Sequence, residues 1–526
     1  MLRDLFRTKS IEQLQATMEA PEHKLKRNLG AFDLTLFGLG AIIGAGIFST
    51  IGTAAAGNIA DGRLAAGPSL VVSILVVAFA CLFTALAYAE MASMIPVSGS
   101  AYTYAYATMG ELAAWIIGWD LLLEYAVSNV AVAISWGDYA RSFLANVFHV
   151  HIPGWLAMDP RTALALNEGA DVSASLAEKL DMLASAKAGG PESAFFVNWD
   201  VLNESPTILG FPVTINLLAV IITVVITYLV YRGIKESSRV NNWMVILKVF
   251  ILLLVIGAGV KFVSGDNYVP FFPNSWRGVQ AGAAIIFFAF IGFDSVSTTA
   301  EECRNPSRDL PRGILWSLAI CTIIYSLIAL VVTGMIKYAQ LEGVADPLAY
   351  IFEHHGFTAM AGIISGGAVI ATTAALLVFQ VAQPRIFMAM GRDGLLSSWF
   401  GKISPKRKTP ANATMITGLM VAIPAAFLNI SEVVELCNIG TLFAFVLVCT
   451  GVVILRLKRP DVPRRFKMPL YWLSAPIGIL ACVWLALGLP WLTWTRFVLW
   501  LLVGLAIYAI YGRRNSRLRH ENEGVG

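Results

Sequence analysis

Long apolar segments dominate this chain and are separated by short polar and charged stretches. A run of about twenty apolar residues is long enough to cross the hydrocarbon core of a bilayer as an α-helix. Such runs predict twelve membrane helices, near residues 32–57, 69–95, 111–138, 212–231, 242–263, 278–300, 313–336, 358–390, 411–429, 434–455, 471–489 and 493–511. We therefore expect an all-α polytopic membrane protein.

Two of these segments are interrupted by glycine where a membrane helix would otherwise be continuous. The first reads GLGAIIGAGIF from Gly38 to Phe48, and the second reads FFAFIGFD from Phe287 to Asp294. An unwound turn at membrane depth is tolerated only where protein or a water-filled cavity surrounds it, and a matching pair of broken helices points to a transporter binding site. The alternative is that these glycines only allow close helix packing.

The two broken helices occupy matching places in the chain. Helices one to five begin with a broken member, and so do helices six to ten. Because five is an odd number, the second set enters the membrane from the opposite side, as in inverted-repeat transporters that bind substrate between the broken helices. We predict a first repeat at 31–263, a second at 278–456 and two further helices at 470–512.

Composition and charge agree with this plan and give it a direction. The 526 residues are 57% hydrophobic and 14% charged, whereas soluble domains have about 25% charged residues. If the N-terminus is cytoplasmic, the segments on that side carry 27 lysines and arginines and those on the other side carry nine. We therefore expect a protein of the cell membrane. The positive-inside rule then places both of its terminal segments, residues 1–30 and 513–526, in the cytoplasm.

The longest segment between predicted helices, at about residues 140–211, falls on the outer side. It is either an extracellular cap or a solvated insertion, and Ser173 to Lys187 has the pattern of a short amphipathic helix.

The two breaks offer both partners that an amino-acid zwitterion needs. The carboxylate suits the positive N-terminal end of a half-helix, and the ammonium suits the carbonyl groups that an unwound turn leaves unpaired. The candidate substrate contacts are Ile42, Gly44, Ala45 and Gly46 in the first break and Phe288, Ala289 and Ile291 in the second.

Ionisable residues inside membrane spans are candidates for function. Lys248 lies about six residues into the fifth helix, so it either reaches back to the membrane surface or is buried as an amine that gains and loses a proton in place of a sodium ion. Glu124 in the third helix either pairs permanently with Lys248 or relays protons. Asp294 is expected to cap the half-helix after the second break, and contact with a bound amine is the alternative.

Several classes of protein fit the sequence less well. The six cysteines form no C-x-x-C pair and all six histidines lie outside the predicted spans, so we expect no metal site, no cofactor and no enzyme activity. A channel would need a symmetric filter, and a nutrient-sensing receptor usually carries a large cytoplasmic domain. Neither a nucleic acid nor an obligate protein partner is expected, whereas membrane lipids surround the helices.

Five segments carry a family resemblance: GAFDLTLFGLGAIIGAGIF, PVSGSAYTYAYATMGELAAWIIGWDLLLEY, FFAFIGFDSVSTTAEECRNPSRDLPRGI, RIFMAMGRDGLL and NIGTLFAFVLV. They resemble the bacterial form of the cationic amino acid transporter branch of the amino acid–polyamine–organocation superfamily. The resemblance implies a sodium-symporter-like fold with a five-plus-five inverted repeat and two additional C-terminal helices. It also implies that the first break binds the substrate carboxylate, that the second binds the amine and side chain, and that Lys248 and Glu124 couple transport to protons.

Two positions bear on which amino acid is carried. Ala45 stands where bacterial relatives often have a hydroxyl residue, and Phe379 appears at the position that lines the side-chain pocket. A large aromatic side chain there shortens the pocket. We therefore expect proton-coupled uptake of small to medium neutral L-amino acids such as alanine, with no requirement for sodium. The alternative is a uniporter or exchanger of cationic amino acids or polyamines.

Overall fold

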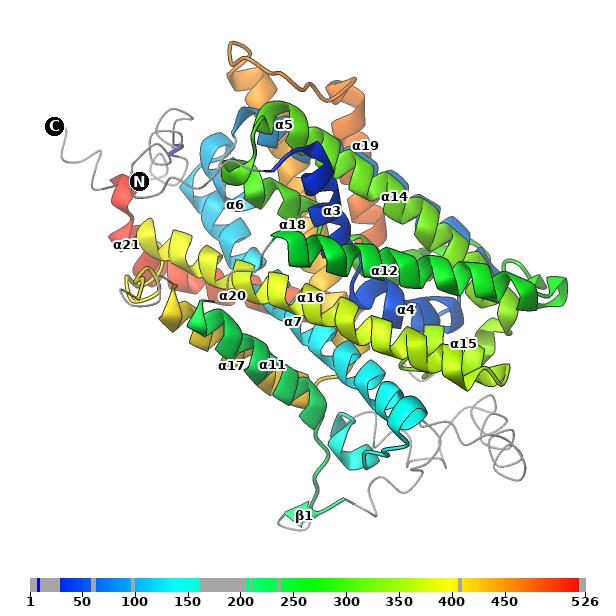
Figure 1. Ribbon diagram of the computed structural model, residues 1–526. Helices are drawn as coiled ribbons and strands as arrows, with labels where there is room; N and C mark the ends of the chain where they lie inside the picture. The colour runs from blue at the N-terminus through cyan, green and yellow to red at the C-terminus, as the bar shows by residue number, and fades with distance from the viewer. Residues whose placement is uncertain are drawn as a thin grey trace.

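The computed structural model describes residues 7–9, 29–57, 63–95, 100–160, 205–208, 211–233, 238–404 and 409–519. Figure 1 shows long helices packed side by side in one bundle. The elements at the twelve predicted positions are α3 (Ala31–Ile42) with α4 (Ala45–Ala56), α5 (Leu70–Met94), α7 (Glu111–Phe148), α11 (Leu217–Arg232), α12 (Ser238–Gly259), α13 (Ser275–Ile286) with the 3₁₀ helices η6 (Phe287–Phe290) and η7 (Phe293–Glu302), α14 (Pro306–Met335), α16 (Thr358–Arg392), α17 (Ala411–Phe427), α18 (Ile430–Lys458), α19 (Tyr471–Ala486) and α20 (Trp491–Ile507).

Length and hydropathy support a polytopic membrane protein. Among the described residues, eight helices are long and apolar enough to cross a membrane, and so is the bent pair α3–α4. Three shorter apolar helices, α11, α17 and α19, occupy the remaining predicted positions. The predicted fold class is therefore confirmed.

Short elements connect these helices. They are the 3₁₀ helices η2 (Gly67–Ser69), η3 (Gly154–Leu156), η4 (Val260–Phe262), η5 (Gly265–Tyr268) and η8 (Tyr338–Leu341), the α-helices α6 (Ser100–Thr108), α15 (Pro347–His354) and α21 (Arg513–Asn515), the π-helix η9 (Tyr508–Gly512), and a two-stranded antiparallel ladder of β1 (Thr207–Ile208) and β2 (Phe211–Pro212).

The third membrane helix is longer than predicted. We expected it to end near residue 138, where Asp138 and Arg141 interrupt the apolar pattern, but α7 continues to Phe148 and ends where His149 takes a left-handed conformation. The polar residues do not break the helix because its last turns contact distant segments of the protein. Ser142, for example, donates a hydrogen bond to Asp346, which precedes α15. The amphipathic helix predicted at 173–187 lies outside the described residues.

The two sets of five helices interlock. The first set begins with α3–α4 and the second with α13, η6 and η7, so each opens with its broken member. Helix α7 of the first set packs against α16 of the second, and α3 and α5 both pack against α14. This arrangement brings the two breaks together inside the bundle, although they are about 250 residues apart in sequence.

Both terminal segments meet at one end of the bundle, which we call the termini end (Figure 1). The Nζ atom of Lys9 lies 2.7 Å from Oδ1 of Asp393, and the backbone N–H of Arg517 donates to the carbonyl of Asp393 at 3.0 Å. The Tyr102 hydroxyl donates to the other carboxylate oxygen of Asp393 at 2.6 Å. These contacts tie residues from both ends of the chain to the loop that follows α16.

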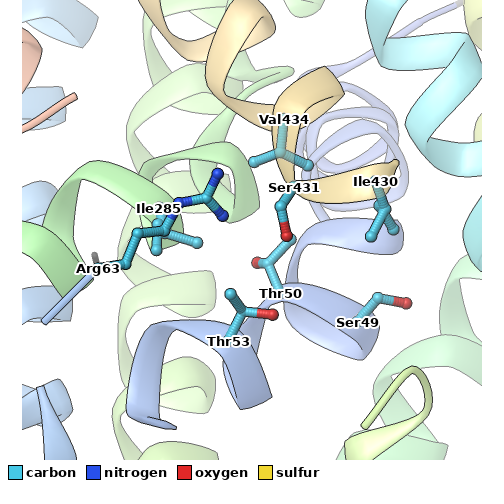
Figure 2. Close-up of a pocket in the computed structure, with 8 residues that line it drawn as sticks. All are labelled: Ser49, Thr50, Thr53, Arg63, Ile285, Ile430, Ser431 and Val434. Carbon is cyan, nitrogen blue, oxygen red and sulfur yellow. The ribbon is translucent and has the colours of Figure 1, made fainter. Parts of the chain in front are cut away.

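At the opposite end of the bundle, a buried ion pair joins the connection between α4 and α5 to α18. Arg63, in the connection between α4 and α5, places Nη2 at 2.8 Å from Oε1 of Glu435 in α18. The hydroxyl of Thr493 in α20 donates to Glu435 Oε2 at 2.8 Å. Figure 2 shows the Arg63 side chain beside Ile285, with its guanidinium pointing toward Ser431 and Val434 of α18.

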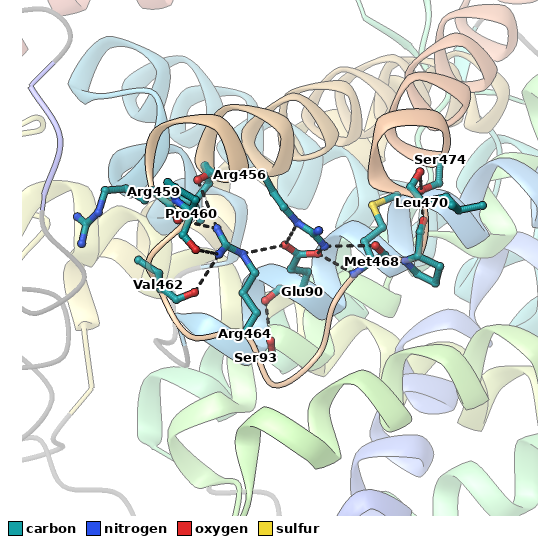
Figure 3. Close-up of polar contacts among 12 residues, drawn as sticks. Glu90, Ser93, Arg456, Arg459, Pro460, Val462, Arg464, Met468, Leu470 and Ser474 are labelled. Atoms are coloured by element: carbon teal, nitrogen blue, oxygen red, sulfur yellow. Dashed lines mark hydrogen bonds and ion pairs between the residues drawn. The ribbon is translucent and has the colours of Figure 1, made fainter.

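A second charged network lies at the termini end (Figure 3). The carboxylate of Glu90, near the end of α5, accepts hydrogen bonds from Nε and Nη2 of Arg456 at 2.8 and 2.6 Å. Arg464 places Nε at 3.4 Å from the same carboxylate, and the backbone N–H of Met468 donates to it at 2.7 Å. Because these donors surround the buried carboxylate, the connection between α18 and α19 is held firmly against α5.

Candidate substrate site at the two helix breaks

The first break lies between α3 and α4, where the predicted glycine interruption occurs. Helix α3 ends at Ile42, α4 begins at Ala45, and the two half-helices are bent by 45°. Gly44 is the N-cap residue of α4 and has an extended backbone with φ of −142°. The first amides of α4, including those of Ala45 and Gly46, therefore form the positive end of a half-helix that begins inside the protein.

The second break interrupts the sixth helix. Helix α13 ends at Ile286, η6 continues to Phe290, and the backbone becomes extended at Ile291. Gly292 follows with φ of +117°, a conformation that side-chain-bearing residues rarely adopt. The predicted contact residues Phe288, Ala289 and Ile291 are all buried.

The two breaks are in direct contact with each other. A Cβ atom added to Gly46 would lie 2.3 Å from Cα of Ala289, and one added to Gly292 would lie 2.8 Å from the carbonyl oxygen of Ala41. The backbones can approach this closely only because both positions are glycine. Close packing and a helix break are therefore not alternatives here, because the same glycines provide both.

Lys248 joins the first break from α12. Its side chain is 1% exposed, and Nζ donates to the carbonyl oxygens of Gly40 at 2.9 Å and Ile43 at 3.1 Å. The interpretation that Lys248 reaches back to the membrane surface is therefore wrong, and its amine is buried; that this amine gains and loses a proton remains a prediction. The positive charge lies at the C-terminal end of α3, where the helix dipole and unpaired carbonyls favour a cation.

A tyrosine that was not identified from the sequence donates a hydrogen bond to one of the carbonyl groups predicted to bind the substrate. The Tyr325 hydroxyl, from α14, donates to the carbonyl of Ile42 at 3.1 Å. We had expected carbonyls near Ile42 to receive the substrate ammonium, and this one already accepts a hydrogen bond. The contribution of Ile42 to substrate binding remains a prediction. No signal in the sequence singled out Tyr325, because Thr322 and Ser326 place further hydroxyl groups in the same span.

Glu124 lies in α7 and faces acidic rather than basic neighbours. Its side chain is 4% exposed, Asp294 and Asp120 are the charged groups that act on it, and Thr441 of α18 is a hydrogen-bond partner. Lys248 instead contacts the carbonyls of the first break. This placement favours separate roles for Glu124 and Lys248 over a permanent pair.

Asp294 does not have the capping position predicted for it. The N-cap residue of η7 is Gly292, and Asp294 is the second residue of that helix. Its carboxyl group lies near the backbone amides of Gly292, Asp294 and Ser295 and also faces Glu124. The phenol rings of Tyr88 and Tyr125 approach the same carboxyl groups, so acidic and aromatic side chains gather beside the second break.

Phe379 lies in α16 beside the first break. It is 8% exposed, and its ring packs edge-on against Tyr125 with centroids 5.7 Å apart. Ala375, one turn earlier in α16, is the residue that a Cβ atom on Gly44 would approach, at 3.4 Å. Phe379 is thus positioned beside the predicted substrate contacts, although its effect on substrate size remains a prediction.

Comparison with known proteins identifies the family. A family model described as "Amino acid permease" matches residues 29–509. The branched-chain amino acid permease BcaP of Bacillus subtilis is 44% identical over 518 residues, which cover 98% of this chain and 100% of that protein. The methylthioribose transporter of the same organism is 40% identical over 517 residues, covering 98% of this chain and 100% of that protein.

A more distant relative connects the chain to the branch that the motifs resemble. The vacuolar cationic amino acid transporter 4 of Arabidopsis thaliana is 34% identical over 466 residues, which cover 88% of this chain and 68% of that protein. These relatives are transporters and not enzymes. The broken-helix fold and the full-length matches together show that the chain belongs to the amino acid permease family of the amino acid–polyamine–organocation superfamily.

Proposed function

We propose that this protein takes up neutral L-amino acids of small to medium size together with protons, by alternating access. The observation that carries the proposal is the contact of the Lys248 ammonium with the carbonyls of Gly40 and Ile43. In transporters of this plan, unwound carbonyls and half-helix C-terminal ends bind the coupling cation. Here a side chain of the protein supplies that positive charge, and it can exchange a proton with its surroundings.

Glu124 provides a second group suited to carrying a proton. It is buried close to Asp294 and Asp120, and buried acidic residues within membrane spans are typical of proton relays. The cluster stands beside the second break, and Lys248 stands beside the first. A substrate bound between the breaks would therefore lie between the two titratable groups, so that its arrival can change the proton occupancy of either.

The amino-acid class follows from the ends of the half-helices. The positive end of α4 at Ala45 and Gly46 suits a carboxylate, and the carbonyls of the second break suit an ammonium. Phe379 fills space beside this site, which favours alanine-sized to leucine-sized side chains over arginine. The relative named for branched-chain amino acids supports this choice, and the one named for cationic amino acids supports the alternative.

We also propose that the termini end faces the cytoplasm. In the sequence, the two terminal segments and the connections predicted to lie on the same side as them carry 27 of the 38 lysines and arginines, which is the bias expected of cytoplasmic segments. The Arg63–Glu435 pair then lies on the outer side of the membrane.

Transport by proteoliposomes tests the proposal. With an inward proton gradient, purified protein should accumulate labelled alanine or leucine without sodium, and excess arginine or methylthioribose should compete weakly. Glu124→Gln should abolish accumulation driven by the gradient, while Glu342→Gln, in the connection before α15, should not. Absence of uptake for every amino acid, or strict dependence on sodium, would refute the proposal; preferred uptake of arginine would favour the cationic alternative.

A further inference from the structure

A small cavity lies at the end of the bundle opposite the termini, separate from the two breaks (Figure 2). Its volume is about 10 Å³, which is room for roughly one water molecule. The residues that line it come from α4, α13, α18 and the connection after α4: Ser49, Thr50, Thr53, Arg63, Ile285, Ile430, Ser431 and Val434. Its floor is the half-helix α4 whose first residues form the candidate carboxylate site.

Arg63, which lines this cavity, belongs to a buried ion pair with Glu435. The Arg63 and Glu435 side chains are 9% and 4% exposed, and their Nη2 and Oε1 atoms are 2.8 Å apart. Thr493 holds the other oxygen of the Glu435 carboxylate through a hydrogen bond of 2.8 Å. The pair thus joins the connection after α4 to α18 and α20, and it must separate if the path from this end to the breaks is to open.

Separation of such a pair is costly unless other charges replace it. A buried charge that loses its partner is strongly destabilising, whereas a guanidinium group binds carboxylates in a bidentate geometry. An α-amino acid carries one carboxylate and one ammonium group a few bonds apart. It can therefore satisfy Arg63 with the first and Glu435 with the second at the same time. A solute with one charge satisfies one partner and leaves the other bare.

We propose that Arg63 and Glu435 form an outer docking site for amino-acid zwitterions, which the substrate occupies before it reaches the helix breaks. The inference rests on the proposed transport function and on its orientation. The hydroxyls of Thr53 and Ser431 line the same cavity and supply further hydrogen-bond partners. The ion pair closes the site when no substrate is present, and the arriving zwitterion takes the place of each partner in turn.

Uptake kinetics from the outer side test this site. The variants are Arg63→Gln and Glu435→Gln, measured in oriented proteoliposomes with the best transported neutral amino acid. Each should raise the external KM about tenfold and change kcat less than about twofold. The matched control is Glu432→Gln, which removes a neighbouring ion pair with Arg496. This pair is more exposed, with the Arg496 side chain at 36% and that of Glu432 at 16%, and neither residue lines the cavity. This control should keep the wild-type KM.

The direction of the change in KM separates docking from simple closure. If the pair only holds this end closed, removing it favours the outward-open form, and the external KM falls or stays constant. The double variant Arg63→Gln with Glu435→Gln removes both charges at once. It should keep the raised KM, and an external KM at or below the wild-type value would overturn the inference.

Two further outcomes have separate meanings. If Arg63→Gln does not purify as a monodisperse protein, Arg63→Lys serves instead, because it keeps the charge but loses the bidentate geometry, and should raise KM by a smaller factor. Active wild-type protein with unchanged KM in both single variants would overturn the docking site alone. Wild-type protein that transports no amino acid would overturn the proposed function and the docking site with it.

Discussion

Substitution of Gly46 by alanine tests whether direct contact between the two helix breaks holds the site together. The added methyl carbon would lie 2.3 Å from Cα and 2.7 Å from the backbone nitrogen of Ala289. Carbon atoms in ordinary contact are about 3.5–4.0 Å apart, so one backbone must retreat by more than about 1 Å. Because both opposing atoms belong to the main chain, no side-chain rotation relieves the overlap.

The size of the effect follows from two opposing contributions. Overpacking of a well-packed interior costs about 1–3 kcal/mol, and alanine in place of glycine within a helix returns at most about 1 kcal/mol. We expect a net loss of about 1–2 kcal/mol in the free energy of unfolding, seen as a thermal midpoint lower by a few degrees. Transport should fall further, by at least about tenfold, because the two breaks that frame the candidate site are pushed apart.

The control for Gly46→Ala is Gly44→Ala, two residues earlier in the same break. A Cβ atom there would lie 3.4 Å from its nearest neighbour, the Cβ of Ala375, and the extended backbone accepts alanine. Gly44→Ala should therefore keep the wild-type thermal midpoint. Scanning fluorimetry in detergent and uptake by proteoliposomes measure the two properties. Equal stability and equal uptake for the Gly46 and Gly44 variants would refute the contact between the breaks as the reason for glycine.

Three further predictions concern single side chains. Lys248→Ala should retain substrate binding but lose the response of uptake to pH, measured at two pH values; the exposed Lys261→Ala is the control, and a preserved pH response would contradict the coupling role. Phe379→Ala should enlarge the side-chain pocket and increase competition by arginine against labelled alanine at least about tenfold, and an unchanged competition profile would place Phe379 outside the pocket. Burial, reinforced by Asp346, raises the pKa of Glu353 to about 7, so its contribution to stability is present at low pH and is lost as pH rises through that value. Glu353→Gln should therefore flatten the fall in thermal midpoint between about pH 5 and 8, and an unchanged slope would contradict this account.

The breaks and the helix plan were predictable from the sequence because they depend on local features. Apolar runs of sufficient length and glycine-rich interruptions determine where the chain can cross a membrane and where it can unwind. The prediction missed the end of α7 because Asp138 and Arg141 resemble the start of a loop when their surroundings are unknown. In the folded protein, those turns pack against segments more than 200 residues away, so a helix is retained there.

The partners of the buried groups could not be predicted in the same way. Lys248 was identifiable as a charged residue inside a span, but its contacts with carbonyls more than 200 residues earlier depend on how α12 crosses α3. The same holds for the Tyr325 hydroxyl on the Ile42 carbonyl, because the two lie 283 residues apart. Local pattern identifies which residues are unusual, and tertiary packing decides what they contact.

The network around Glu90 has a consequence for how the protein is made. Glu90 and Arg456 are 366 positions apart in the chain. At a synthesis rate of about 5–20 residues per second, Arg456 is therefore added roughly 20–70 s after Glu90. Until then an acidic side chain near the end of the second helix has neither of its arginines. A chain that stops before Arg456 lacks both arginines that neutralise this carboxylate, so we expect the second helix to reach its final packing only after the C-terminal helices have been made.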